Sequence, residues 1–208
     1  MNQQFINDAI RTESRIERID NINPRYLHSA IMLAIASANV LDAFKKGIFY
    51  RRPVDPSKFY ECLRTAQMAH MNLMHGLVTD DLNGDGEPVE GRGGSVLDIN
   101  AVDPRILHAV IGKFTETGEM FEALEKVMAD GGELDIVNLG EEKGDDAWYD
   151  AILFDATGLD PQAVMDTVIA KLKKRYPEKF TNEAANNRDL DGERAVLESG
   201  LAEEQKAA

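Results

Sequence analysis

Apolar residues recur along the chain at every third or fourth position, which is the spacing of one face of an α-helix. The clearest example follows Pro104, where one stripe is formed by Leu107, Val110, Ile111, Phe114, Phe121 and Met128. No stretch alternates between apolar and polar residues for long enough to indicate a β-strand. The pattern therefore predicts an all-α fold.

Four dipeptides mark the expected starts of helices. Each places a side chain that can cap a helix N-terminus directly before a proline, whose missing N–H would be unpaired at the first helical position anyway. The dipeptides are Asn23-Pro24, Asp55-Pro56, Asp103-Pro104 and Asp160-Pro161. Helix ends are expected at Gly47 and at the pair Gly131-Gly132.

A stretch rich in glycine and aspartate, residues 79–100, predicts a linker or a long loop. It contains the sequence Asp81-x-Asn83-x-Asp85-Gly86. This sequence resembles the first half of a calcium-binding EF-hand loop, but the twelfth position would be Arg92 instead of glutamate, and Pro88 lies inside the loop. An acidic loop without calcium is therefore the preferred interpretation.

The chain repeats itself on either side of this stretch. Five of the eight residues from Pro24 to Ile31 are identical to those from Pro104 to Ile111, at an offset of 80. The constant, gap-free register predicts two helical hairpins of common origin that pack as a pseudo-dimer. The predicted divisions are a first repeat, a loop, a second repeat and a tail, at residues 1–78, 79–100, 101–198 and 199–208.

The second repeat carries two pairs of carboxylates with a spacing of three residues, Glu116 with Glu119 and Glu142 with Asp145. This spacing puts the members of each pair on one face of a helix. If the two helices are antiparallel neighbours, the four carboxylates converge, and like charges held together need a cation. Ligation by oxygen alone favours Mg²⁺ or Mn²⁺ over zinc.

Two further features favour a site over two solvated helix faces. Gly118 and Gly144 each directly precede the last acid of a pair, and glycine inside a helix suggests a close approach of two helices there. The first repeat also lacks all four acids, and its residues at the corresponding positions are Ala36, Asn39, Cys62 and Thr65. Surface charges would be lost one at a time, whereas a site is lost as a unit.

The residues around the carboxylates resemble a known family. Residues 113–119 (KFTETGE) and 141–149 (EEKGDDAWY) look like the paired E-x-x-E and E-x-x-D signature of MazG-like pyrophosphohydrolases. The resemblance extends over roughly residues 24–78 and 104–198, and includes the runs 41–50, 171–180, 187–190 and 193–194. It implies an all-α helical bundle built from two MazG-like repeats, of which the first is degenerate.

The resemblance also implies an activity, the metal-dependent hydrolysis of an NTP or dNTP to the monophosphate and pyrophosphate. The implied ligands of Mg²⁺, or alternatively Mn²⁺, are Glu116, Glu119, Glu142 and Asp145. A bound metal ion lowers the pKa of water and polarises phosphate oxygens. Glu141 and Glu122 are both candidates for the carboxylate that accepts the water proton.

Candidate substrate contacts are Lys171, Arg175, Trp148, Tyr149 and Lys45. Lys171 and Arg175 are four residues apart on one helix face and suit the β and γ phosphates, although a solvated basic face is the alternative. The two aromatic residues either stack on the base or belong to the core. Some relatives have an asparagine where this chain has Val168, so one substrate contact of the family is absent.

Composition narrows the partners and the location. The chain has 23 basic and 37 acidic residues, a net charge of −14, which opposes binding to nucleic acid or to an anionic membrane. No apolar run of the roughly 18 residues that a membrane span needs and no secretory signal are recognised, so a cytoplasmic location is expected. The expected partners are a nucleoside triphosphate and further copies of the chain, as a homo-oligomer of pseudo-dimers.

Three other functions are compatible with parts of the pattern. A ferritin-like di-iron protein needs Glu-x-x-His on two helices, which neither helix provides. A non-catalytic regulator that binds nucleotide or metal would keep the carboxylates without hydrolysis. A pyrophosphatase specific for one dNTP would share the site and differ only in the pocket walls, and the base, the sugar and the number of metal ions stay open.

Overall fold

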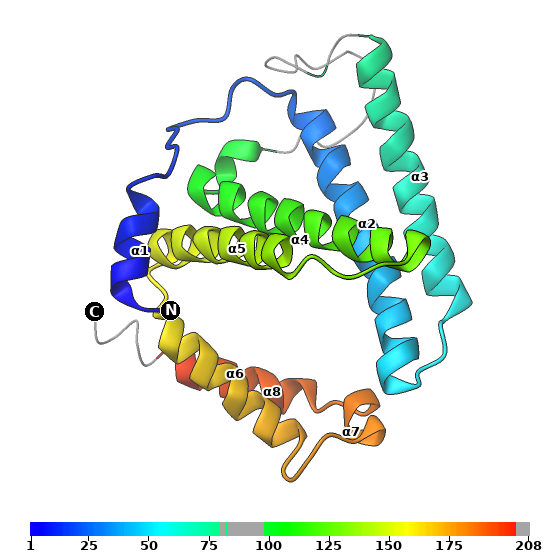
Figure 1. Cartoon of the computed structure of the whole chain (residues 1–208), viewed down its shortest axis with the longest axis vertical. Helices are drawn as coiled ribbons and strands as arrows, with labels where there is room; N and C mark the ends of the chain where they lie inside the picture. The colour runs from blue at the N-terminus through cyan, green and yellow to red at the C-terminus, as the bar shows by residue number, and fades with distance from the viewer. Residues whose placement is uncertain (80–81, 83–97, 203–208) are drawn as a thin grey trace. The chain divides into compact units, whose positions relative to one another are not determined.

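The computed structural model describes residues 1–79, 82 and 98–202, and these residues form helices and no β-strand (Figure 1). The all-α prediction is confirmed. The elements are α1 (Gln3–Ile10), α2 (Pro24–Tyr50), α3 (Pro56–Val78), the short 3₁₀ helix η1 (Ile99–Ala101), α4 (Pro104–Asp130), α5 (Ile136–Thr157), α6 (Pro161–Arg175), α7 (Asn182–Asn186) and α8 (Leu190–Ala202). The acidic residues of the EF-hand-like sequence lie outside the described residues.

Helices begin where the capping dipeptides predict. In α2, α3, α4 and α6 the capping side chain accepts a backbone N–H of the first turn, and proline occupies the first helical position. Asp135 caps α5 in the same way without a proline. Helices α2 and α4 contain 27 residues each and begin 80 residues apart, at Pro24 and Pro104. The starts of α3 and α5, at Pro56 and Ile136, have the same separation.

The expected end of α2 at Gly47 is wrong. The helix continues to Tyr50 and ends where Arg51 adopts a φ of 53°, in the left-handed region. A glycine inside a helix costs only about 1 kcal/mol, which the backbone hydrogen bonds of the following turn offset. Gly131 and Gly132 both have positive φ and end α4 as predicted.

The described chain divides into two compact units. One unit comprises Met1–Glu17, Val102–Pro177 and Asp189–Ala208, and so contains α1, α4, α5, α6 and α8. The other comprises Arg18–Ala101 and Glu178–Arg188 and contains α2, α3 and α7. This grouping differs from the divisions predicted from the repeat, because it places α1 with α4 and α5, and α7 with α2 and α3.

The unit with α2 and α3 is a helical hairpin closed by an aromatic contact. A Cβ atom added to Gly76 on α3 would lie 2.6 Å from the ring of Tyr26 on α2, so the ring packs directly on the α3 backbone. The Tyr26 hydroxyl also lies 3.4 Å from Nδ1 of His75. Helix α7 contacts the end of α2, where the side-chain amide of Asn186 donates to the carbonyl of Tyr50.

The unit with α4 and α5 is built on a second hairpin, in which the two helices lie side by side (Figure 1). The ring of Tyr149 packs on Gly112, where an added Cβ would lie 2.1 Å from it. One residue later on α4, Lys113 forms an ion pair with Asp146 on α5. Contacts that advance along α4 therefore move backwards along α5, which makes the helices antiparallel.

Helix α1 packs on α5 and forms a small core with it. Ile6 and Ala9 are buried against Ala151, and Trp148 covers them. The indole N–H of Trp148 lies 2.9 Å from the hydroxyl of Thr12 and 3.2 Å from the carbonyl of Ala9. The N-terminal segment therefore packs against the second repeat, although the sequence placed it in the first.

A bidentate ion pair holds the end of this segment to α4. Arg105 donates to both carboxylate oxygens of Glu13 at 2.7 and 2.8 Å, and to Asp155 at 2.6 Å. Burial alone would raise the pKa of Glu13, but the hydrogen bonds from Arg105 and Arg15 outweigh it and hold the pKa below its ordinary value. The ionised form of Glu13 therefore stabilises the fold.

The apolar stripe of α4 remains on one face but is not buried within its unit. Val110, Phe114 and Phe121 are about half exposed, and Met128 is 78% exposed. The apolar residues of the stripe lie on a single helix, as the spacing predicts. Their side chains nevertheless stay largely exposed in the described residues. The expectation that no run is long enough for a membrane span differs from the structure here, because among the described helices α2 has the length and apolar composition to cross a membrane and only 11% of its apolar window is buried. One such helix is weak evidence, since core helices of water-soluble proteins pass the same test.

We expect Gly112→Ala to destabilise the protein by about 1–3 kcal/mol, because the new methyl group overlaps the Tyr149 ring and the two helices must move apart. Gly140→Ala on α5 is the matched control. A Cβ there meets open space, so the higher helix propensity of alanine should stabilise by up to about 1 kcal/mol. Urea unfolding measures both changes, and equal effects of the two variants would contradict the close approach at Gly112.

We expect Glu13→Gln to lower stability at pH 7 by about 1.5–3 kcal/mol, the range for hydrogen bonds to charged groups. Because the folded-state pKa of Glu13 lies below its ordinary value of 4.5, this contribution is present above that pH and is lost as pH falls through the folded-state pKa. The variant and the wild type should therefore converge in urea unfolding at low pH. The exposed Glu17 provides the control Glu17→Gln, for which the difference at pH 7 should be small.

Candidate metal centre

The four predicted ligands lie on the two helices of the α4–α5 hairpin. Glu116 and Glu119 are on α4, and Glu142 and Asp145 are on α5. One carboxylate oxygen from each of Glu116, Glu119 and Glu142 lies within 4.8 Å of the other two. Glu116 and Glu142 are buried and Glu119 is exposed, so the cluster has one open side.

Negative charge at this point shifts the pKa of two of the acids. Burial is the largest cause of the raised pKa of Glu116, and the neighbouring carboxylates raise it further. The charge of Glu142 is the largest cause of the raised pKa of Glu119, followed by burial. Asp145 contributes to both shifts and so lies near the cluster, although its oxygens fall outside the group within 4.8 Å.

Two exposed carboxylates border the cluster. After Glu142 and burial, the charges of Glu122 and Glu141 also help to raise the pKa of Glu119. Both are therefore close enough to Glu119 to influence it. The two candidates for the acceptor of the water proton both lie near Glu119, and that role stays a prediction for both.

Asn138 is a part of the site that sequence reasoning missed. Its side-chain amide donates to Oε1 of Glu142 at 2.7 Å, from one turn earlier on α5. This bond orients the Glu142 carboxylate, which leaves its second oxygen for another ligand. The signal in the sequence is an asparagine four residues before a glutamate, which is too common to single out without the structure.

Lys113 is a second missed residue, and it joins the two helices beside the cluster. Its ammonium group lies 2.6 Å from Asp146 and 2.7 Å from Asp150 on α5. Burial alone would lower the pKa of Lys113, but these two carboxylates outweigh burial and raise it. Lys143 also pairs with Asp146, so the two lysines neutralise Asp146 and Asp150. Neither lysine pairs with a carboxylate of the cluster, which stays negative.

The close helix approach expected at Gly118 and Gly144 is wrong. A Cβ at either glycine would meet no atom within 4 Å, because neither faces the other helix closely. The close approach occurs at Gly112, under the ring of Tyr149. The pKa of Tyr149 is raised by burial and then by the charges of the cluster, chiefly that of Glu116, which places the phenol near the carboxylates.

Trp148 and Tyr149 differ in their surroundings. The indole N–H of Trp148 bonds to the α1 segment, and its ring covers the α1–α5 core. The rings of Trp148 and Tyr149 meet edge to face, with centroids 4.9 Å apart. His108 contacts both rings. Trp148 thus has a structural role, and the ring of Tyr149 packs on Gly112, so a contact of either residue with a base stays a prediction.

The predicted phosphate contacts lie on helix α6, apart from the carboxylate hairpin in sequence. Arg175 donates to Glu193 on α8, with one bond of 2.8 Å, and Glu193 is buried. Lys171 lies one turn earlier on the same helix and is partly exposed. Lys45 belongs to the other unit, where it pairs with Asp42 at 2.7 Å. A substrate role for these three residues stays a prediction.

Comparisons of the chain with protein-family models, with curated proteins and with solved structures find no match. The assignment of function therefore depends on the chemistry of the site and on the motif resemblance.

The donor set fits a hard divalent cation. Carboxylate oxygens are the ligands that Mg²⁺ and Mn²⁺ prefer, and three of them lie close enough to share one ion. The raised pKa values of Glu116 and Glu119 indicate that the acids repel one another without a counterion. A divalent cation removes this repulsion. Zinc sites usually include imidazole or thiolate ligands, which this cluster lacks.

We expect Mg²⁺ or Mn²⁺ to raise the stability of the wild type by about 2.7 kcal/mol at a concentration one hundred times its Kd. In Glu119→Gln this gain should be much smaller, because one of three clustered carboxylates is neutralised. Without metal, the variant should be at least as stable as the wild type, because repulsion is reduced. Thermal unfolding with and without metal measures both effects. Glu125→Gln, an exposed acid further along α4, should behave as the wild type.

Proposed function

We propose that the chain is a metal-dependent nucleoside triphosphate pyrophosphohydrolase, as the resemblance to MazG-like proteins implies. The observation that carries the proposal is the convergence of Glu116, Glu119 and Glu142 from two antiparallel helices, with oxygens within 4.8 Å of one another. Acids that merely keep a surface soluble would spread apart to reduce repulsion. Here the packing of the hairpin keeps them together.

In this proposal Glu116, Glu119 and Glu142 hold Mg²⁺, and Asp145 completes the site from its edge. The bound ion supplies a lowered pKa for coordinated water and stabilises charge on the phosphate oxygens. The exposed carboxylate of Glu122 or Glu141 accepts the proton from the attacking water. Asn138 keeps the Glu142 carboxylate in orientation through the bond of 2.7 Å.

The substrate in this proposal is a nucleotide with a triphosphate chain. Lys171 is the better candidate for a phosphate contact, because Arg175 already uses two of its five N–H donors on Glu193. Arg175 then serves mainly to hold α6 against α8. Tyr149 is the candidate for contact with the nucleotide through its phenol, which lies near the carboxylates, because its ring packs on Gly112 and Trp148 is engaged by α1.

The test is release of pyrophosphate from each of the eight common NTPs and dNTPs, with and without Mg²⁺. We expect metal-dependent release by the wild type and by Glu125→Gln. Release by Glu119→Gln should fall by more than about 100-fold, since loss of groups that only orient a metal ligand already costs 10–100-fold. The ranking of the eight nucleotides also distinguishes a broad enzyme from one that is specific for a single dNTP.

No release from any nucleotide, by a protein that Mg²⁺ still stabilises, would overturn the hydrolase and favour a regulator that binds metal or nucleotide. Equal release by Glu119→Gln and the wild type would show that the hydrolysis takes place elsewhere or comes from a contaminant.

A further inference from the structure

A hollow of about 390 Å³ lies in the other unit, at the end of the α2–α3 hairpin. Its walls come from the last turns of α2, the connection before α3 and the first turns of α3. Its volume is within the range of sites for small molecules. Three of the lining side chains are cationic, Lys46, Arg52 and Lys58. None of these three residues is among the candidate site residues predicted from the sequence.

The acids that line the hollow are already engaged. Asp42 forms ion pairs with Lys45 and Lys46, which hold its pKa below the ordinary value through hydrogen bonds. Asp55 accepts the backbone N–H groups of Ser57 and Lys58 as the N-cap of α3. Within the described residues, the side chains of Arg52 and Lys58 form no ion pair. The three cations and two carboxylates that line the hollow leave it with a net charge of +1.

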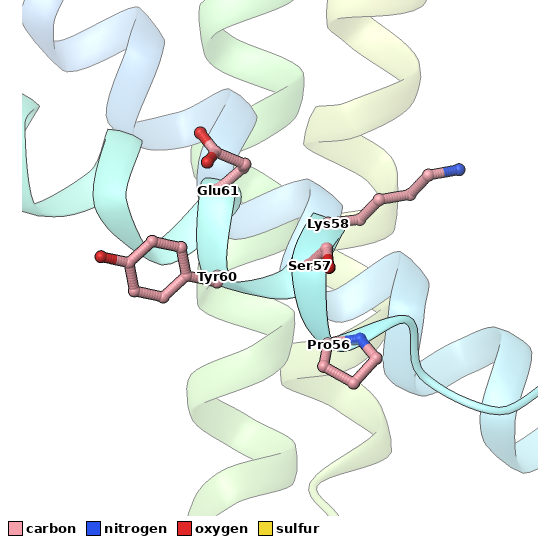
Figure 2. A pocket seen from close by; sticks show the side chains of 5 residues that line it. All are labelled: Pro56, Ser57, Lys58, Tyr60 and Glu61. Atoms are coloured by element: carbon pink, nitrogen blue, oxygen red, sulfur yellow. The ribbon is translucent and has the colours of Figure 1, made fainter.

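Lys58 occupies a boundary between two hollows. Figure 2 shows the start of α3, where Lys58 and Tyr60 extend to opposite sides of the helix. The second hollow, of about 610 Å³, is lined only by residues of this helix start, Lys58 among them. The 390 Å³ hollow has walls from both helices and their connection, so it can surround a ligand more completely.

The position of the hollow corresponds to that of the carboxylate cluster in the other hairpin. At the offset of 80 that relates the helix starts, Asn39 and Cys62 correspond to Glu119 and Glu142. Both line the hollow. Lys58 corresponds to Asn138, the partner of Glu142. Two acid positions of the cluster are therefore uncharged in α2–α3, and Arg52 and Lys58 stand where α4–α5 has Gly132 and Asn138. This end of α2–α3 is the more positive of the two.

We propose that this hollow binds the phosphoryl group of a small oxyanion, without a metal ion. Arg52 offers a planar fork of N–H donors that matches two phosphate oxygens, and Lys58 adds a compact positive charge. Inorganic phosphate, pyrophosphate and the terminal phosphate of a nucleotide share this chemistry. The proposal goes beyond the hydrolase function, because the site lies in the other unit and needs no carboxylate ligand.

Cys62 provides a direct reporter, because it lines the hollow and is the single cysteine of the chain. The rate of its alkylation by iodoacetamide, a neutral reagent, is measured in EDTA with phosphate, pyrophosphate or a nucleoside triphosphate. EDTA removes the metal that the carboxylate cluster would need. At a concentration five times Kd, the bound anion should slow alkylation about six-fold by mass action. Sodium chloride at equal ionic strength should have no such effect.

The variants Arg52→Gln and Lys58→Gln should each weaken this protection about ten-fold or more, as expected for loss of a charge-assisted contact. Arg64→Gln is the matched control, because Arg64 lies on α3 outside the hollow and pairs with Glu61. Circular dichroism checks that all three variants fold. The anion that protects at the lowest concentration identifies the natural class of ligand.

Isothermal titration calorimetry of pyrophosphate in EDTA gives the second measurement, independent of thiol reactivity. Binding by the wild type and by Arg64→Gln, with loss in Arg52→Gln, is the expected result. No heat of binding with any of the three anions would overturn the proposal, as would protection of Cys62 that chloride reproduces or that Arg52→Gln leaves unchanged. Neither result depends on whether the protein hydrolyses nucleotides with Mg²⁺.

Discussion

The packing of α4 against α5 depends on one close approach, where the ring of Tyr149 lies on the backbone of Gly112. No side chain fits between them, so this contact sets both the separation and the register of the helices. One residue further along α4, Lys113 reaches α5 through its ion pairs. One turn later, Glu116 meets Glu142. The carboxylates are brought together by the packing of their neighbours and not by any attraction of their own.

Holding these acids together opposes stability, and the raised pKa values of Glu116 and Glu119 reflect that opposition. The offsetting contacts lie in the same unit: the ion pairs of Lys113, the core beneath Trp148 and the bidentate bond between Glu13 and Arg105. Proteins accept local destabilisation where function requires it and compensate for it nearby. The repulsion between carboxylates is confined to one cluster with an open side. This confinement favours the interpretation of the cluster as a functional site over that of a surface that only keeps the protein soluble.

The features that sequence could predict are those that depend on neighbouring residues. Capping side chains before prolines gave the starts of α2, α3, α4 and α6, and the three-residue spacing gave the two pairs of acids. The features it missed depend on which residues face each other across two helices. The role of Lys113 follows from the register, and so does the glycine that matters, Gly112 instead of Gly118. Asn138 was missed for another reason, because an asparagine one turn before a glutamate on the same helix is a common pattern. The docking of α1 on α5 joins segments about 140 residues apart, which no local pattern could indicate.

The two hairpins show that backbone frame and site chemistry are set by different residues. The frame depends on helix caps, such as Asp55 and Asp135, and on ring-on-glycine contacts, while the chemistry depends on a few side chains near the hairpin end. The acids can therefore be absent, as at Asn39 and Cys62, and cations such as Arg52 and Lys58 present nearby, without disturbing the helices. The net charge of −14 does not oppose an anion at such a place, because salt screens exposed charges beyond about 8–10 Å. Binding is decided by the charges that line the hollow, so an acidic protein can carry a cation site and an anion site in different units.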